Sequence, residues 1–186
     1  TVSLDAESGA LTMAAATKVE ATGSSLRLAA SGDITLGAVV ATDVSVVSTG
    51  GKVVTAAAVS GNIHAPTLRL AAAGSIGTGA DPLTVTVSKV SASSNGAGIY
   101  LVGSSGVTVD SITVTVTEMR SDTTTVPVTD GAQSTIRTDA NGNIVLVATT
   151  GNIVLTEALN ANGSGNVRVE ALSGNVSLQA DINHIG

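Results

Sequence analysis

The sequence contains no cysteine, no tryptophan and no phenylalanine, and its single aromatic side chain is Tyr100. The lack of cysteine excludes a disulfide framework and a thiolate metal site. The lack of large rings means that the hydrophobic core must be thin, because small aliphatic side chains cannot fill a wide space at native packing density.

Basic residues are also few. Eight Lys and Arg stand against 14 Asp and Glu, the formal net charge is -6, and the basic residues are scattered along the chain. Nucleic-acid binding needs a concentrated basic surface that neutralises phosphates, so we expect no nucleic-acid partner. No uninterrupted apolar run approaches the roughly 20 residues of a membrane-spanning helix, and we expect no membrane span.

The residues that are abundant favour β-structure. Val, Ile and Thr fit a pleated, half-buried surface, and apolar and polar residues alternate strictly in segments such as 83–87 and 112–116. Many such segments begin about 8 to 10 residues apart with Gly, Asn, Asp or Ser between them, which is typical of an all-β solenoid, barrel or sandwich. No segment has helical spacing over three turns, so we expect essentially no helix.

Internal repeats favour the solenoid among these three architectures. Residues 167–178 align without a gap on residues 2–13, and residues 26–34 align on residues 68–76. A sandwich does not repeat its own strands, and a barrel needs larger interior side chains. With about 20 residues per coil, we predict one parallel β-solenoid over residues 1–186 with about nine coils.

One turn motif recurs throughout the chain. Gly followed by Asn or Asp and then Ile or Val bends the backbone cheaply and begins the next strand. The expected structural turn residues are Gly32 and Asp33, Gly61 and Asn62, Gly142 and Asn143, Gly151 and Asn152, Gly165 and Asn166, and Gly174 and Asn175.

One segment breaks the rhythm. From Glu118 to Asp139 the sequence is polar and irregular and contains Pro127. Because a central ladder strand does not accept proline, we expect residues 118–139 to form a polar loop excursion from the rod.

Candidate catalytic chemistry is sparse. His64 and His184 are the only histidines, and both are expected to be solvated surface residues. The carboxylates are isolated in sequence, and no nucleophile elbow is present. We therefore expect no catalytic and no cofactor-binding residue, and no enzyme; a polysaccharide-active β-helix enzyme is the third hypothesis, which a groove with three or more converging acids would favour.

Asp139, Asn141 and Asn143 are the candidate metal ligands. Their D-x-N-x-N spacing begins like a calcium loop, but Gly142 stands at the fourth position and the bidentate Glu is missing. A structural calcium is one interpretation. A turn in which the Asn side chains bind backbone groups is the other, and the sequence favours it.

Three arginines lie between apolar residues on expected strands: Arg27, Arg69 and Arg168. The alternation points them outward. Such charges deter unwanted strand pairing, and a ligand-binding face is the alternative.

Several of these segments together resemble a known family. Residues 73–83, 98–101 and 106–109, with the Gly-Asn-Ile/Val units, are similar to the repeats of very large bacterial exoproteins of the filamentous haemagglutinin type. The resemblance implies a right-handed parallel β-helix that is exported to the cell surface or the medium. It implies no catalytic or binding residue here.

The expected function is therefore structural. We expect a segment of an extracellular bacterial fibre, filament or adhesin stalk, whose partners are further coils of the same type in a longer chain or in head-to-tail subunits. The alternative is an adhesin module that contacts a receptor, a polysaccharide or another host or matrix surface ligand through residues 118–139.

Overall fold

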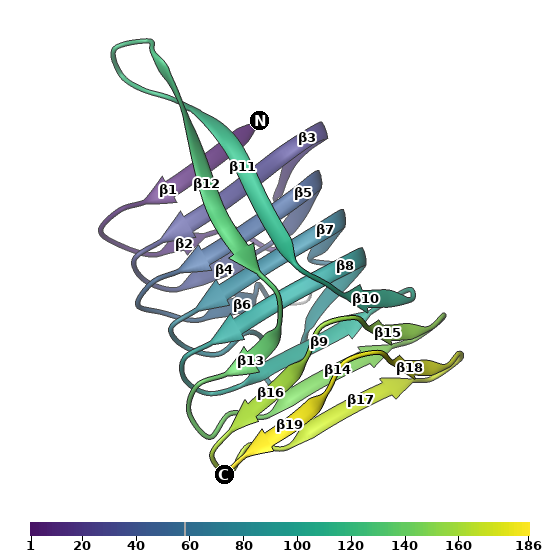
Figure 1. Cartoon of the computed structure of the whole chain (residues 1–186). Coiled ribbons are helices and arrows are strands. Elements are labelled where there is room, and N and C mark those ends of the chain that lie inside the picture. The colour runs from purple at the N-terminus through teal and green to yellow at the C-terminus, as the bar shows by residue number, and fades with distance from the viewer. Residues whose placement is uncertain (58) are drawn as a thin grey trace.

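The computed structural model describes residues 1–57 and 59–186, and all of its regular elements are β-strands (Figure 1). In chain order these strands are β1 (Val2–Ala6), β2 (Leu11–Thr12), β3 (Lys18–Ala30), β4 (Ile34–Leu36), β5 (Ala38–Ser48), β6 (Val53–Thr55), β7 (Ile63–Ala72), β8 (Leu83–Ser94), β9 (Ile99–Gly103), β10 (Val107–Val109), β11 (Ile112–Met119), β12 (Thr125–Gln133), β13 (Ile136–Thr138), β14 (Ile144–Ala148), β15 (Ile153–Leu155), β16 (Leu159–Asn162), β17 (Val167–Ala171), β18 (Val176–Leu178) and β19 (Ile182–Ile185). The described residues include no helix that could cross a membrane.

The strands stack as a parallel β-solenoid, which confirms the predicted fold class. The main sheet has the order β1-β3-β5-β7-β8-β10-β15-β18, so the chain makes about eight turns, close to the expected nine. The turns are longer than expected at the carboxyl end, where stacked Asn residues such as Asn143 and Asn166 are 23 positions apart. One pair of strands, β11 and β12, is antiparallel.

Aliphatic side chains fill the solenoid in continuous columns. Pairing of adjacent strands places Leu26, Val44, Leu68 and Val90 directly above one another, and none of them is exposed to solvent. This stacking buries apolar surface in a narrow core without aromatic rings, as the composition predicts.

The shape of the turn changes once along the rod. Before the change, a single long strand such as β7 or β8 forms the part of each turn that several short strands form after it. β8 then pairs along its length with three successive short strands, β9, β10 and β13. The following turns keep this three-strand form, as in β14, β15 and β16. β8 is therefore the strand at which the cross-section switches.

This switch explains why the longest sequence repeat joins segments that are not equivalent in space. Val167 stacks on Ile144, which stacks on Ile99, and this column continues through Ile76 towards the amino end. Val2 begins a different column, the one that contains Leu26. Both segments consist of a strand, a Gly-containing corner and a second strand. This unit lies at one corner of the turn in residues 2–13 and at another corner in residues 167–178. Residues 26–34 and 68–76, in contrast, occupy matching positions two turns apart.

The core columns run to the last turn and end on exposed side chains. Leu178 is 59 % exposed and Ile182 is 41 % exposed, while the residues they stack on, Leu155 and Leu159, are fully buried. At the other end, Leu4 of β1 is 39 % exposed. Within the described residues, the outer edges of β1, β18 and β19 pair with no strand.

Candidate functional site

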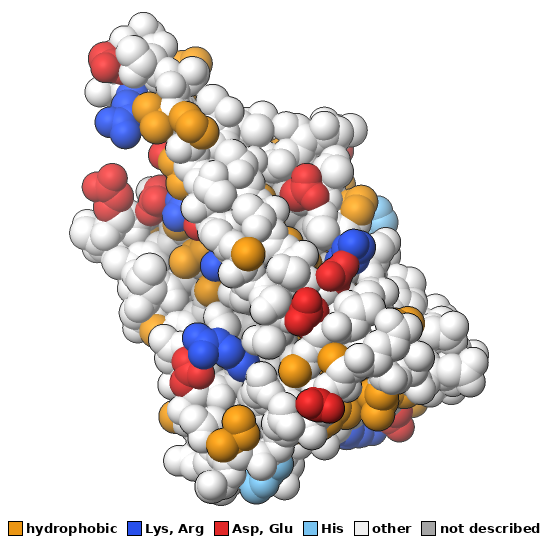
Figure 2. All heavy atoms as spheres, viewed as in Figure 1, with side chains coloured by type: hydrophobic (Ala, Val, Ile, Leu, Met, Phe, Trp, Pro, Cys, Tyr) orange, Lys and Arg blue, Asp and Glu red, His pale blue; other side chains and the backbone are white. Residues whose placement is uncertain are grey.

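The segment with the most distinctive structure is the hairpin of β11 and β12, which we call the arm. It leaves the solenoid after β10, crosses the sheet over β8, β7, β5, β3 and β1, and extends beyond β1 (Figure 1). In the space-filling view it is a ridge that projects past the amino-terminal end of the rod (Figure 2).

The arm differs from the loop excursion expected at residues 118–139. That segment contains the end of β11, all of β12 and β13, and β13 has already rejoined the solenoid ladder. Pro127 is accepted because β12 pairs with β11 alone among the described strands and Pro127 is exposed to solvent. Proline is tolerated on such an edge strand.

One face of the arm is apolar and packs onto the sheet. Ile112, Val114 and Val116 are at most 3 % exposed, whereas the alternate residues Thr113 and Thr115 face solvent. The alternation therefore buries one side of β11 against the solenoid and leaves the other side polar. The arm is a packed element of the fold over most of its length.

Beneath the arm, the outward residues of the sheet form a column that alternates serine and arginine. Register pairs Ser3 with Arg27, Arg27 with Ser45, Ser45 with Arg69, and Arg69 with Ser91. We call these five residues the Ser/Arg column. Both of its arginines make polar contacts with the arm.

Arg27 is the centre of these contacts. Its Nε lies 3.1 Å from Asp130 Oδ2 on β12, its Nη1 lies 3.1 Å from Asp5 Oδ2, and Glu118 Oε1 is 3.7 Å from the same nitrogen. The side chains of Arg27 and Asp130 are only 13 % and 12 % exposed. Burial alone would lower the pKa of Arg27, but the hydrogen bonds and attraction of Asp5 and Asp130 outweigh it and raise that pKa.

Arg69 makes a weaker attachment further along the column. Its Nε donates to the Gly131 carbonyl at 3.1 Å, and burial lowers its pKa despite the attraction of Asp130. Gln133 at the end of β12 donates from Nε2 to the Leu70 carbonyl at 2.8 Å. Three buried polar atoms here have no hydrogen-bond partner among the described residues: Ser45 Oγ, Ser91 Oγ and Arg69 Nη1.

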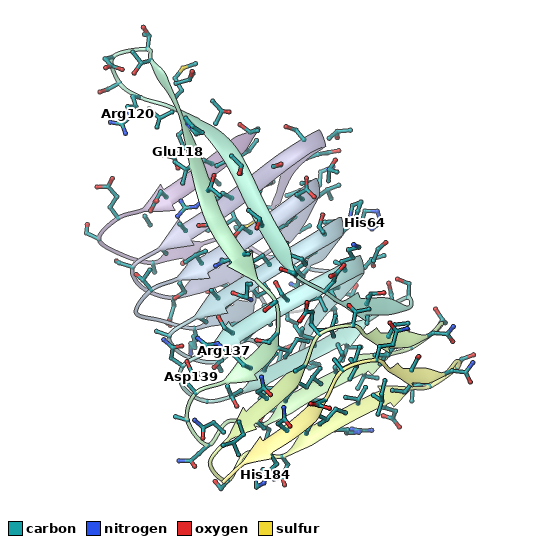
Figure 3. All side chains as sticks on the ribbon, in the orientation of Figure 1. His64, Glu118, Arg120, Arg137, Asp139 and His184 are labelled. Atoms are coloured by element: carbon teal, nitrogen blue, oxygen red, sulfur yellow. The ribbon has the colours of Figure 1, made fainter. Side chains whose placement is uncertain are left out.

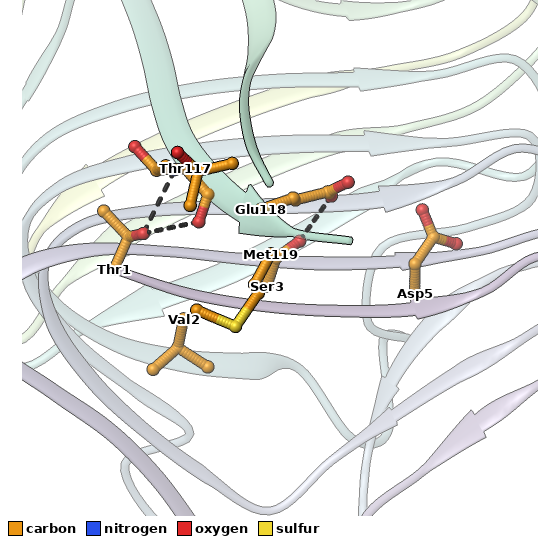
Figure 4. A pocket seen from close by; sticks show the side chains of 8 residues that line it. Thr1, Val2, Ser3, Asp5, Thr117, Glu118 and Met119 are labelled. Atoms are coloured by element: carbon orange, nitrogen blue, oxygen red, sulfur yellow. Dashed lines mark hydrogen bonds between the residues drawn. The ribbon is translucent and has the colours of Figure 1, made fainter. Parts of the chain in front are cut away.

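The overhang of the arm leaves a cleft at the amino-terminal end. It measures about 620 Å³ and lies between β1 and the distal arm, with Thr1, Val2, Ser3 and Asp5 on one side and Thr117, Glu118, Met119 and Thr125 on the other (Figure 4). Ser3 Oγ donates to Glu118 Oε1 at 2.7 Å, and Thr1 Oγ1 donates to the Thr117 carbonyl at 2.9 Å.

Asp5, Glu118 and Asp130 thus converge, although they are isolated in the sequence. Their common neighbour is the Arg27 guanidinium, which lies within 3.7 Å of all three carboxylates. Within the described residues, no group of three or more His, Cys, Asp or Glu side chains has the geometry to hold a metal ion. The convergence is that of an ion cluster that fixes the arm.

The histidines lie away from this cluster. His64 is an exposed residue of β7, and His184 is an exposed residue of β19 near the opposite end of the rod (Figure 3). Arg168 is also apart: it lies on β17 beside Glu170, is 63 % exposed and belongs to a different column from Arg27 and Arg69. The three arginines that look alike in sequence therefore have two different environments.

The calcium candidates lie at a stacked corner. Asp139 Oδ1 is 3.1 Å from Arg137 Nη1 (Figure 3), Asn141 Oδ1 accepts from the Ser164 backbone at 2.9 Å, and Asn143 Oδ1 accepts from the Asn166 backbone at 2.8 Å. One side-chain oxygen of each of the three candidates already has a protein partner. The donor set therefore fits a turn better than a calcium site.

Two more of the expected turn residues, Asn152 and Asp33, make the same contact with the next coil. Asn152 Oδ1 accepts from the Asn175 backbone at 2.8 Å, and Asp33 Oδ1 accepts from the Lys52 backbone at 2.9 Å. Asn62 is fully buried; its Nδ2 donates to the Leu36 carbonyl at 3.2 Å. Each side chain thus satisfies a backbone group at a corner, where the ladder is interrupted.

The glycines of these corners serve two purposes. Gly61 and Gly151 have φ angles of 77° and 76°, as expected for sharp bends. The other four have ordinary φ angles, and a Cβ at Gly32, Gly142, Gly165 or Gly174 would crowd the backbone of the turn below. At Gly142, Gly165 and Gly174, where a Cβ would approach backbone atoms to less than 3.0 Å, close stacking of corners requires glycine; at Gly32 the distance is 3.1 Å and the contact is only tight.

Sequence reasoning missed the functional pairing of Arg27 with Glu118 and Asp130. A signal was present in the outward position of successive strands, which reads Ser3, Arg27, Ser45 and onward in alternation. No protein-family model, curated protein or solved structure matches this chain.

Proposed function

We propose that this chain is a structural segment of an extracellular bacterial fibre, filament or adhesin stalk, built as a right-handed β-helix that continues with further coils at both ends. The observation that carries the proposal is the run of aliphatic columns to exposed residues at the last turn, Leu178 and Ile182. A solenoid end of this kind exposes both apolar surface and unpaired backbone groups, which natural repeat proteins cover.

The similarity of Gly-rich corner units to filamentous haemagglutinin-type exoproteins supports the same function. The contacts between turns support the same function. Each turn is joined to the next by parallel ladders, by stacked aliphatic columns and by Asn side chains that bind the next corner. A rod of this kind transmits load along its axis through many equivalent contacts.

Extension of the chain tests the proposal. The last turns repeat every 23 residues, so a second copy of residues 164–186 placed after Gly186 keeps every column in register. We expect the added turn to fold, to raise Tm and to slow amide exchange in β17, β18 and β19. The same residues in scrambled order are the control. An ordered copy that stays unfolded and leaves Tm unchanged would show that this end is not built to accept a coil.

The second candidate function is ligand binding through the arm. The observation that favours it is the exposed tip at residues 119–124, which projects beyond the rod with Met119 76 % exposed. Replacing residues 121–123 with Asn-Gly keeps the hydrogen-bonded pair of Arg120 and Thr124 and so keeps β11 paired with β12. Loss of adhesion to host or matrix surfaces, with Tm and rod shape unchanged, would favour this second function over the purely structural one.

A further inference from the structure

The alternation of the Ser/Arg column has a physical cause. Adjacent parallel strands lie about 4.8 Å apart, and like charges directly opposite one another destabilise a sheet. A serine between two arginines leaves room for the guanidinium groups and separates them. β3 and β7 both carry Leu-Arg-Leu-Ala-Ala, whereas β1, β5 and β8 carry serine at the arginine position. A strand added outside β1 therefore meets Ser3 and has room for an arginine.

The carboxylates near the edge of β1 favour an additional cation there. Three carboxylates, those of Asp5, Glu118 and Asp130, surround the guanidinium of Arg27, and Arg69 attracts only Asp130 among them. Asp130 and Asp5 each lie 3.1 Å from Arg27, whereas Glu118 lies 3.7 Å away, accepts from Ser3 and lines the cleft together with Asp5. The Asp5 side chain is 41 % exposed. At the edge of β1, Asp5 and Glu118 thus share one guanidinium, that of Arg27.

The cleft supplies the space. It is bounded by β1 below and by Glu118 and Met119 above, so a strand paired with β1 would lie under the overhanging arm (Figure 4). Its alternate residues would cover Val2, which is partly buried, and Leu4, which is 39 % exposed.

We propose that the edge of β1 under the arm is an acceptor site for a parallel β-strand of the Leu-Arg-Leu type, whose arginine stacks on Ser3 and pairs with Glu118 and Asp5. The inference rests on the proposed function, because it specifies the coil that covers the amino-terminal end. It makes the overhanging arm a clamp that selects the incoming strand by charge.

The carboxyl-terminal turn of an identical copy does not have this chemistry. In the core columns, Leu178 corresponds to Val2 and Ile182 corresponds to Leu4. Three residues, beginning with Gln179, separate Leu178 from Ile182, whereas Ser3 alone separates Val2 from Leu4. The preferred occupant is therefore an Arg-bearing coil of the β3 or β7 kind.

An extension at the amino terminus tests the acceptor site. Register pairs Thr67 with Lys89 and Arg69 with Ser91, and β1 resembles the second half of β8. A copy of residues 67–88 placed directly before Thr1 therefore sets the copied arginine against Ser3. The matched control is the same extension in which that arginine is replaced by serine.

We expect the Arg-bearing extension to fold and to slow amide exchange of β1 and the distal arm by roughly tenfold relative to the serine control, since a hydrogen bond to a charged group has about this effect. Glu118→Gln in the host chain should remove most of the difference. Equal protection by both extensions would overturn the arginine selection and leave the proposed function standing. Failure of both to fold would overturn the acceptor site itself, and the carboxyl-terminal extension would then report separately on the proposed function.

Discussion

Replacement of Arg27 by leucine is the sharpest test of how the arm is held. Leucine keeps an apolar stem in place of the arginine side chain but removes the guanidinium that Asp130 and Asp5 contact at 3.1 Å. Removing one partner of a buried ion pair costs about 3–5 kcal/mol, because the other charge is left without compensation. Since Arg27 and Asp130 retain 13 % and 12 % exposure and Asp5 is more open, we expect the lower end of that range, about 3 kcal/mol.

The measurement is hydrogen exchange of β12 amides together with urea unfolding. A loss of about 3 kcal/mol corresponds to exchange that is faster by about 150-fold, at 1.4 kcal/mol per tenfold. The effect should centre on the arm, because solenoid turns beneath it retain their columns and ladders. Urea unfolding then reports whether the arm and the rod lose structure together or in separate steps.

Arg168→Leu is the matched control. Arg168 also lies between two apolar residues of a strand and also has an acidic neighbour, Glu170, but it is 63 % exposed. We expect at most about 0.5 kcal/mol there, as for other surface ion pairs. Equal losses for the two arginine variants would refute the assignment of Arg27 as the anchor. So would a double variant, Arg27→Leu with Asp130→Leu, that recovers none of the lost stability.

Two further predictions concern a corner and an ion pair. Gly174→Ala should lower Tm markedly, because the added Cβ would overlap the Gly151 carbonyl oxygen. The control is Gly9→Ala, which should leave Tm nearly unchanged because a Cβ has open space there. Comparable Tm values for the two variants would contradict the close stacking of corners. A hydrogen bond from Lys89 and one from a backbone amide lower the pKa of Asp110, so its contribution to stability is present above the unfolded pKa of about 3.9 and is lost as pH falls through the depressed folded value. Asp110→Asn should therefore lower Tm modestly at neutral pH and match the original chain in strong acid; a difference that grows on acidification would show that the sign is wrong.

Much of the solenoid could be predicted because its determinants are local. Three consecutive residues, Gly142, Asn143 and Ile144, determine one corner. The alternation around Leu26 determines which side chains enter the core. Parallel stacking then brings similar residues together automatically, as Leu68 and Leu26 show two turns apart. The absence of helix in the described residues follows from these local signals, whereas the number of turns, about eight against the expected nine, is predicted only approximately because the turns lengthen to 23 residues.

The arm could not be predicted in the same way because its pairing is not local. Alternation at Ile112, Val114 and Val116 is the same for a ladder strand and for a hairpin strand that packs across a sheet. What distinguishes them is the antiparallel partner β12 and the burial of the arm on the Ser/Arg column, and both depend on distant residues such as Arg27. A repeat in sequence is also not a guarantee of equivalence in space, since Val167 and Val2 lie in different columns.

The position of the arm follows from the switch in cross-section at β8. The chain leaves the solenoid after Val109, which stacks on Val90, and returns at Ile136, which stacks on Ala92, so the insertion interrupts neither core column. Towards the carboxyl end, the corner between β15 and β16 breaks the outward surface. Towards the amino end, the long strands β7, β5 and β3 present an unbroken sheet on which Val114 and Val116 can be buried. The arm therefore folds back over these long strands and extends beyond β1, where Glu118 lies beside Ser3.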